Sequence, residues 1–244
     1  MLGRAASDSP SRHSLECRQG RCDRNVPRHV LRPRKKQEFA DKPDASDANS
    51  LRWAAQENPM AEIKIRHARI DDCPALGRII VSATQDAFRG RVPDQCLNWL
   101  TPEESATNWA KNFTSDQSLE PGDYLFVAET QNEVIGLAML SEITPEYGYE
   151  PYIASRYSHE LLSLQVAPLW QRQGVGRRLL ARIAGELGKE KTTHLLVRAL
   201  VDNPNLAFYE RLGAIRIAKR PYEWEGYETE EIIFGWEDIG RLRK

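Results

Sequence analysis

The segment Gln171-Arg172-Gln173-Gly174-Val175-Gly176 decides the fold predicted for this chain. An apolar stretch at 161–166 precedes it and predicts a strand, whereas residues 174–189 follow with apolar side chains at helical spacing. The two glycines let the backbone turn tightly and approach a ligand closely. The first turn of the helix adds unpaired N–H groups and the positive end of the helix dipole. The segment therefore predicts an anion site built from backbone, which suits a pyrophosphate.

Two other nucleotide-binding classes do not match this turn. The chain has no Gly-x-x-x-x-Gly-Lys-Ser/Thr sequence, so it lacks the P-loop of the NTPases. The turn also lacks a full Gly-x-Gly-x-x-Gly and no first βαβ unit frames it, which argues against a dinucleotide-binding fold. A Gly-x-Gly turn taken alone is equally compatible with a tight structural connection that binds nothing.

Charge is distributed unevenly along the 244 residues. The chain is 41% apolar and 28% charged, with a net charge of -1, which indicates a folded, soluble protein of one domain plus an appendage. Residues 1–59 hold 12 Lys/Arg against 8 Asp/Glu, and the remainder holds 22 against 27. Because the predicted folded part is acidic, and no apolar run is long enough for a membrane span, we expect neither nucleic acid nor membrane as a partner. The same balance favours a cationic substrate.

The sequence divides near residue 60. Residues 1–60 are rich in Arg, Ser, Asp and Pro without apolar periodicity, which predicts a disordered basic and polar tail. Residues 61–240 carry the patterning of a single folded domain. We expect a cytoplasmic protein, with a nuclear or mitochondrial address as the alternative that the basic tail leaves open. The four cysteines form no Cys-x-x-Cys pair, and we predict no metal site.

The folded part predicts strands alternating with helices. We expect helices at 71–83, within 93–113, at 174–189 and at 203–212, with Pro102 and Pro204 at first helical positions. Strands are predicted at 63–67, 124–129, 134–141, 161–166, 194–201, 215–218 and 231–236. Residues 144–158 read as an irregular loop. This order predicts an α/β (α+β) layer fold with a mixed sheet.

Two motifs together resemble one family. Gln171-x-x-Gly174-x-Gly176 is similar to the Arg/Gln-x-x-Gly-x-Gly/Ala motif of the GNAT superfamily of acetyl-CoA-dependent N-acetyltransferases. The stretch Asn203-Pro204-Asn205-Leu206-Ala207-Phe208-Tyr209-Glu210-Arg211-Leu212-Gly213 resembles the second signature of that superfamily. The resemblance covers residues 62–237. It implies a mostly antiparallel central sheet flanked by helices, with splayed central strands.

The resemblance also implies how acetyl-CoA binds as co-substrate. The backbone of Leu164, Gln165 and Val166, at the end of the predicted strand, would pair with the pantetheine arm. An N–H near Val166 would polarise the thioester carbonyl. The turn would hold the pyrophosphate. The family asparagine seven positions before Tyr209 is Asp202 in an ungapped register, and a slip of one residue supplies Asn203 instead. The implied cofactor-binding residues are Leu164, Gln165, Val166, Gln171, Arg172, Gln173, Gly174, Val175, Gly176, Arg177 and Asn203.

Two residues are the predicted catalytic pair. Tyr209 matches the tyrosine that protonates the departing CoA thiolate, and its other interpretation is a core aromatic residue beside Phe208. Glu160 resembles glutamates that serve as the base in some family members, and its other interpretation is a solvated carboxylate at a strand edge. The acceptor amine is mostly protonated at pH 7 because its pKa is about 10 for a lysine-like amine, so a base is required.

The amine acceptor is expected to bind between three segments, which are Phe88–Pro93, 144–158 and Pro221–Glu231. From these we predict Phe88, Tyr152 and Trp224 as substrate-binding residues. Acidic residues interleave with aromatic ones in the last segment, which suits an ammonium group, although a solvated hairpin loop has the same composition. Arg89-Gly90 followed by Pro93-Asp94 resembles the acceptor segment of one GNAT branch, but Thr84 stands where that branch usually has Trp.

These features predict an enzyme that transfers an acetyl group to a primary amine of a small molecule or peptide by direct attack in a ternary complex. A monomer or homodimer is expected. Two alternatives stay open from the sequence. The chain could be a non-catalytic acyl-CoA-binding module, which the Asp202 departure favours, or an interaction protein that uses its basic tail on an acidic partner.

Overall fold

A computed structural model describes residues 62–113, 119, 122–131 and 133–243. Its centre is a seven-stranded sheet in the order β1-β2-β3-β4-β5-β7-β6. Only β4 and β5 pair in parallel. The strands are β1 Lys64–His67, β2 Tyr124–Glu129, β3 Val134–Glu142, β4 His159–Val166, β5 Leu195–Leu200, β6 Ile215–Trp224 and β7 Tyr227–Trp236. The helices are α1 Cys73–Phe88, α2 Pro102–Ala110, α3 Pro151–Ala154, α4 Val175–Lys189 and α5 Leu206–Arg211.

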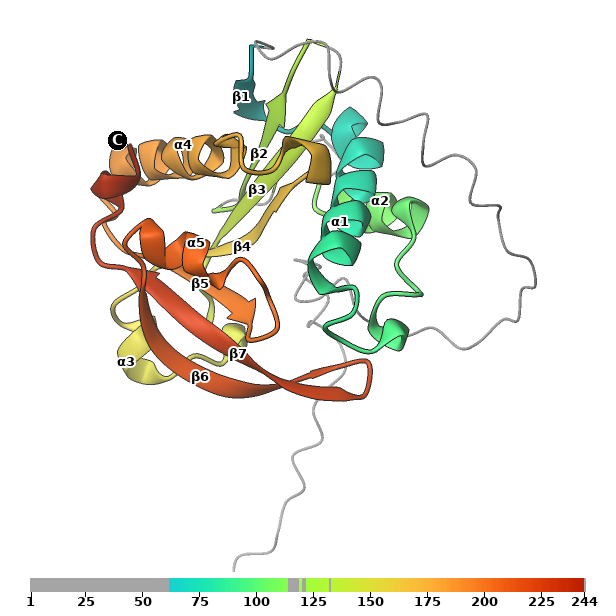
Figure 1. Cartoon of the computed structure of the whole chain (residues 1–244). Helices are drawn as coiled ribbons and strands as arrows, with labels where there is room; N and C mark the ends of the chain where they lie inside the picture. Colours follow the sequence, from blue (N-terminus) through green and yellow to red (C-terminus); the bar gives the residue numbers. More distant parts are fainter. Residues whose placement is uncertain (1–61, 114–118, 120–121, 132, 244) are drawn as a thin grey trace, which may run out of the picture.

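Helices cover both faces of the β1–β4 half of the sheet (Figure 1). Side chains alternate along β2 and β3, so that successive residues point to opposite faces. Leu125 and Met139 pack under α1 and α2 with Leu76. Phe126 and Leu140 pack on the other face with α4. This half of the sheet is therefore the middle layer of three, and the predicted α/β architecture with a mostly antiparallel sheet is confirmed.

The two halves of the sheet separate at β4 and β5. These strands pair only through Glu160↔Leu196 and Leu161↔Val197. On its other side β4 pairs with β3, and the register of this pairing shifts after Leu161. Leu161 faces Leu140, but the next residue of β3, Met139, faces Ser163, so Leu162 has no partner. Leu162 is the extra residue of a β-bulge, and a bulge bends its strand. The bend turns residues 163–166 away from β5, so the strands splay as the family resemblance implied.

Strands β6 and β7 are much longer than the sequence patterns 215–218 and 231–236 predicted. They pair from Ile215↔Gly235 to Trp224↔Tyr227 and form a hairpin. The two turn residues, Glu225 and Gly226, both have positive φ, at 50° and 76°, as a type I′ turn requires. Charged residues interrupt the apolar pattern of the hairpin, and Arg220 with its cross-strand partner Glu231 is an example of such a pair. Residues 221–231 therefore form a hairpin, as the solvated-hairpin interpretation expected, but most of them belong to paired strands and not to a loop.

The structure differs from the sequence prediction in two further segments, 93–113 and 144–158. The stretch 93–113 is not one helix, because a short 3-10 turn at Asp94–Cys96 precedes α2. The predicted start of α2 is confirmed, since the Thr101 hydroxyl caps the helix by accepting from the Glu104 amide at 3.2 Å. The loop 144–158 contains a 3-10 turn, Pro145–Tyr147, and the short α3. The predicted tail lies outside the described residues, as does residue 132 between the two predicted strands.

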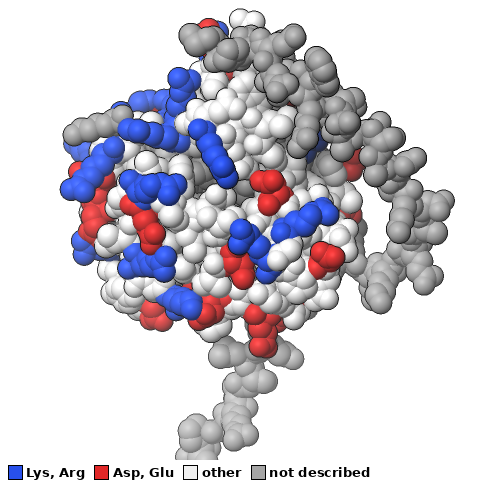
Figure 2. All heavy atoms as spheres, viewed as in Figure 1, with Lys and Arg blue, Asp and Glu red and all other residues white. Residues whose placement is uncertain are grey.

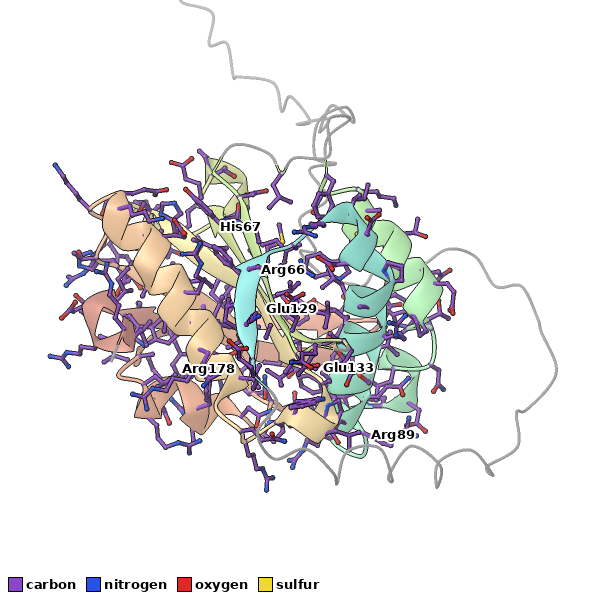
Figure 3. All side chains as sticks on the ribbon, turned by 90° about the horizontal axis from the view of Figure 1, so that it is seen from above. Arg66, His67, Arg89, Glu129, Glu133 and Arg178 are labelled. Carbon is purple, nitrogen blue, oxygen red and sulfur yellow. The ribbon has the colours of Figure 1, made fainter. Side chains whose placement is uncertain are left out.

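Helix α1 is tied to the sheet through Arg66 of β1 (Figure 3). The Arg66 guanidinium donates to both carboxylate oxygens of Asp72, at 2.7 and 2.9 Å, and to Glu129 of β2 at 2.7 Å. Seen from above, β1 lies between α4 on one side and α1 with α2 on the other (Figure 3). Among the described residues, no helix combines the length and apolar character needed to cross a membrane.

Candidate active site

A cavity of about 610 Å³ opens where β4 and β5 separate. One wall comes from β4 and the turn before α4, and the other from β5, α5, the β6–β7 hairpin and the last turns of α1. Residues more than 130 positions apart in sequence therefore share one space. We call the part next to residues 164–166 of β4, α4 and α5 the cofactor end, and the part next to Glu160, α1 and the β6–β7 hairpin the acceptor end.

The turn at 171–176 has the backbone geometry that its glycines predicted. Gly174 adopts φ 81° as the N-cap of α4, and Arg172 adopts φ 61°. A side chain is strained at positive φ, which glycine avoids. The Gln171 side chain donates to the Val166 carbonyl at 3.2 Å and fixes the turn against the end of β4. The first N–H groups of the fifteen-residue α4 thus open into the cavity beside Arg172 and Arg177.

Gly176 brings α4 close to α5. A Cβ atom built at Gly176 would meet the Phe208 ring at 3.3 Å, which is tighter than ordinary van der Waals contact. Gly185 in the same helix has open space at the equivalent atom. The requirement for glycine at 176 therefore comes from packing at the cavity, and the helix itself does not impose it.

The edge of β4 supplies further backbone groups. Leu164, Gln165 and Val166 pair with β3 on one side. On the other side their register has no partner in β5, because β4–β5 pairing ends at Leu161. All three residues line the cavity. An extended ligand lying along β4 would find strand-type donors and acceptors there.

Tyr209 projects from α5 into an aromatic cluster that also borders the cavity. Its ring is 8% exposed and packs against Phe208, Phe234 and Trp236, with ring centroids 5.5 to 6.1 Å away. Burial raises the pKa of Tyr209 to about 12, so the phenol stays protonated at neutral pH. Tyr209 is both a core aromatic residue and a cavity-lining one, which joins the two sequence interpretations.

Glu160 lies in a buried network of charges. It is 1% exposed, and its Oε1 accepts from Arg198 Nε at 2.5 Å. Arg198 Nη1 lies 3.6 Å from Glu231 Oε1, and Glu231 also pairs with Arg220. The solvated strand-edge interpretation of Glu160 is therefore wrong. Its second oxygen, Oε2, is buried without a hydrogen-bond partner among the described residues.

Tyr149 packs against the same network. The guanidinium groups of Arg198 and Arg220 lie over its ring, at 5.6 and 5.4 Å from the centroid. Burial, followed by the charge of Glu160 and the approach of its carboxylate, raises the pKa of Tyr149 well above its ordinary value. Burial lowers the pKa of Arg198, but the neighbouring Glu160 charge more than offsets this and keeps the guanidinium cationic.

The structure gathers most of the predicted site residues around the cavity. Both catalytic candidates line it, as do Phe88 and Trp224 of the substrate set. The cofactor-set residues that line it are Leu164, Gln165, Val166, Gln171, Arg172, Gly174, Val175, Gly176, Arg177 and Asn203. The ambiguity at 202 and 203 is also resolved in space. Asp202 accepts from Thr229 at 2.6 Å and does not line the cavity, whereas Asn203 does.

Two predicted residues lie elsewhere. Tyr152 on α3 is 59% exposed and outside the cavity, because α3 packs on the far part of the β5–β7 half through Ile153. The side chain of Gln173 turns back to donate to the Leu169 carbonyl at 2.9 Å and does not line the cavity. Both residues were predicted from segments near the site, but their side chains do not contact the cavity.

Sequence reasoning missed Arg198 and Arg211 as cavity residues. Arg198 had a signal, because it is the one charged residue in an otherwise apolar buried strand. A buried charge needs a partner, and that partner defines a site. Arg211 had no comparable signal, since it sits in a charged helix end.

The chain is similar to known acetyltransferases. A family model described as acetyltransferase (GNAT) domain matches residues 121–213. The N-acetyltransferase YuaI of Bacillus subtilis is 26% identical over 182 residues, which cover 74% of this chain and 96% of that protein.

Solved structures agree with this fold. The PaiA N-acetyltransferase of Thermoplasma acidophilum, in complex with coenzyme A, matches with a TM-score of 0.56 at 17% identity, over 72% of this chain and 98% of that one. The ribosomal-protein-alanine N-acetyltransferase of Brucella melitensis matches with a TM-score of 0.53 at 25% identity, over 70% and 98%.

The family model, the YuaI relative and the solved structures all point to one class, the N-acetyltransferases, as what this chain resembles. More specifically, residues 121–213 are similar to the GNAT acetyltransferase domain.

Proposed function

We propose that the protein transfers an acetyl group from acetyl-CoA to a primary amine, and that the amine attacks directly while both substrates are bound. The observation that carries this proposal is that Tyr209 and Glu160 line one continuous cavity with the 171–176 turn. Of the residues that the structure describes, no cysteine lines that cavity, and Cys73 and Cys96 are buried elsewhere with thiol pKa values raised by burial. Direct attack therefore needs no covalent enzyme intermediate.

The residues present fit acetyl-CoA. The N–H groups at the start of α4, with Arg172 and Arg177, would hold the pyrophosphate. The unpaired edge of β4 would hold the amide groups of the pantetheine arm in the manner of an added strand. Asn203 lines the same channel and offers a side-chain amide, although its Oδ1 already accepts from the Asn205 amide at 2.8 Å.

Acetyl-CoA supplies an acetyl group activated as a thioester. A backbone N–H near Val166 would donate to the thioester oxygen and stabilise the charge that develops there. Tyr209 would act on the sulfur. A thiol has a pKa of about 8.5, so a phenol with a pKa of about 12 is the weaker acid. Tyr209 therefore stabilises the departing thiolate chiefly by donating a hydrogen bond, and its proton moves fully only if the thiolate is itself desolvated.

Glu160 is the proposed base. The acceptor must lose a proton before it can attack, because an ammonium nitrogen has no lone pair. Arg198 holds Oε1 of Glu160, which leaves Oε2 as the atom that can receive the proton. The ion pair thus orients the carboxylate and reserves one oxygen for the acceptor amine or a water between them.

The test is release of CoA from acetyl-CoA, followed with a thiol reagent over a panel of polyamines, amino acids, arylalkylamines, aminoglycosides and peptides. Acetyl-CoA binding is measured separately by calorimetry. We expect micromolar to millimolar binding of acetyl-CoA and turnover with at least one amine class. Binding without turnover across the whole panel would contradict the proposal and leave a non-catalytic acyl-CoA-binding module.

A further inference from the structure

One wall of the acceptor end is apolar and aromatic. Ala83, Ala87 and Phe88 come from α1, while Leu200 and Trp224 come from the other half of the sheet. The Phe88 and Trp224 rings meet edge to face with centroids 5.3 Å apart. They form a packed aromatic wall that would bury an apolar acceptor body.

The tip of the β6–β7 hairpin is fixed against the segment after α1. Cys96 donates to the Trp224 carbonyl at 3.2 Å, and Gln95 donates to the Glu225 carbonyl at 2.9 Å. Figure 1 shows the hairpin passing below the end of α1. Because both contacts use the hairpin backbone, the wall is preorganised and does not depend on a ligand to assemble.

The charges at this end of the cavity are already paired. Glu160 and Glu231 line it as carboxylates, and Arg198 lies between them. Arg220 pairs with Glu231 from outside the lining. The other acids of the hairpin do not line the cavity, and Glu230 pairs with Lys219. Among the described residues, Oε2 of Glu160 is therefore the only carboxylate oxygen of this network that is buried without a partner.

This pairing limits the acceptors that fit. Each additional ammonium group of a polyamine or aminoglycoside would need another carboxylate, because an unpaired charge is costly to bury. The carboxylate of a free amino acid would need a cation, and Arg198 is already shared between Glu160 and Glu231. A single ammonium beside Glu160, with an uncharged body against the aromatic wall, meets neither obstacle.

Resting on the proposed function, we propose that the acceptor is an arylalkylamine-like primary amine with one positive charge and an aromatic body. The Phe88–Trp224 wall selects the aromatic part of the acceptor. The ion pairs of Arg198 with Glu160 and Glu231 leave no partner for a second charge of either sign. Figure 2 shows Lys and Arg gathered over α4 and α5, which lie at the cofactor end, where positive charge suits the phosphates of acetyl-CoA.

Three amines test the proposal on the full chain. They are 2-phenylethylamine, phenylalanine, which adds a carboxylate to the same body, and 1,4-diaminobutane, which replaces the body by a second cation. We expect kcat/KM for 2-phenylethylamine to exceed both others by about tenfold or more, the scale on which a pocket rejects a poorly matched group.

Two variants locate the selectivity. Phe88→Leu should lower kcat/KM for 2-phenylethylamine about tenfold while leaving acetyl-CoA binding unchanged. Its matched control is Phe113→Leu, since Phe113 packs in the α1–α2 cluster and does not line the cavity. Thr84→Asp places an unpaired carboxylate on the α1 wall and should shift the preference toward 1,4-diaminobutane. A loss of folding in either variant is recognised by its thermal melt, and the wild-type ranking of the three amines then decides.

The outcomes are distinct. If kcat/KM for 1,4-diaminobutane or for phenylalanine equals or exceeds that for 2-phenylethylamine, the acceptor class is wrong while the proposed function stands. If acetyl-CoA binds but none of these or the wider panel of amines is acetylated, both proposals fail. If Phe88→Leu and Phe113→Leu behave alike, the aromatic wall does not select the acceptor.

Discussion

The cofactor end and the acceptor end of the cavity are built from different materials. At the cofactor end the contributors are mostly backbone groups, which are the splayed edge of β4 and the positive-φ turn before α4. At the acceptor end the contributors are side chains, with Phe88 against Trp224 and Glu160 against Arg198. Backbone can hold one invariant ligand by shape, whereas side chains adjust to whichever amine the protein uses.

The difference has a consequence for mutation. A backbone-built site resists most substitutions and yields only where an added side chain fills the space, as at Gly176. A side-chain-built site loses an essential contact with each truncation. Changes at the acceptor end should therefore act on the amine and on chemistry, and changes at the cofactor end should act on acetyl-CoA binding.

The largest effect is expected for Glu160→Gln, where the two ends meet. Loss of the proton acceptor should lower kcat/KM at pH 7 by roughly 1,000-fold. The remaining activity should rise with pH toward the pKa of the free amine, about 10 for an alkylamine. Steady-state rates from pH 6 to 10 measure this. Glu210→Gln is the control, because Glu210 lies beside Tyr209 in sequence but pairs with Arg216 outside the cavity. A rate for Glu160→Gln within twofold of wild type would remove Glu160 from the mechanism.

Tyr209→Phe is expected to lower kcat by about 100-fold without changing the Kd of acetyl-CoA. The wild-type rate should show no alkaline loss from Tyr209 below about pH 10, because burial raises its pKa to about 12. Tyr157→Phe is the matched control. Tyr157 is also a buried tyrosine, but its hydroxyl donates to Glu237 at 2.7 Å and it does not line the cavity. Equal losses in both variants would mean that Tyr209 acts only through packing.

Gly176→Leu should raise the KM of acetyl-CoA by roughly tenfold to 100-fold, the equivalent of 1–3 kcal/mol of overpacking. The side chain would press on Phe208, which a Cβ already meets at 3.3 Å. Gly185→Ala in the same helix should leave the KM unchanged and raise stability by up to about 1 kcal/mol. A normal KM in Gly176→Leu would show that this end of the cavity does not hold the cofactor.

The smallest effect concerns stability. Burial raises the pKa of Asp72, but hydrogen bonds from Arg66 and the Arg69 amide more than offset this, so the folded pKa lies below the ordinary value of an aspartate. The carboxylate therefore stabilises the fold above that value, and the contribution is lost as pH falls through the folded pKa. Asp72→Asn should cost about 1–3 kcal/mol at pH 7, and the difference from wild type should vanish in acid. Urea unfolding at pH 7 and pH 2.5 measures both values, and a pH-independent difference would contradict the ionic origin.

The sequence predicted the cofactor end better than the acceptor end. Strand β2 and the start of α2 follow their local patterns, and ten of the eleven cofactor-set residues line the cavity, Gln173 being the exception. Tyr152 was chosen from the right loop, but α3 turns it away from the cavity. The lengths of β6 and β7 were underestimated because their cross-strand charge pairs carry no apolar pattern.

What the sequence by itself determined was the fold class and the tight turn before α4, because glycine spacing and helix periodicity act over a few neighbouring residues. Only the tertiary structure decided that Asn203 rather than Asp202 reaches the cavity, that Arg198 holds Glu160, and that Phe88 meets Trp224. These contacts join residues 38 and 136 positions apart. The first depends on the parallel pairing of β4 with β5 and the second on the packing of α1 against the β6–β7 hairpin, and no local stretch of sequence encodes either.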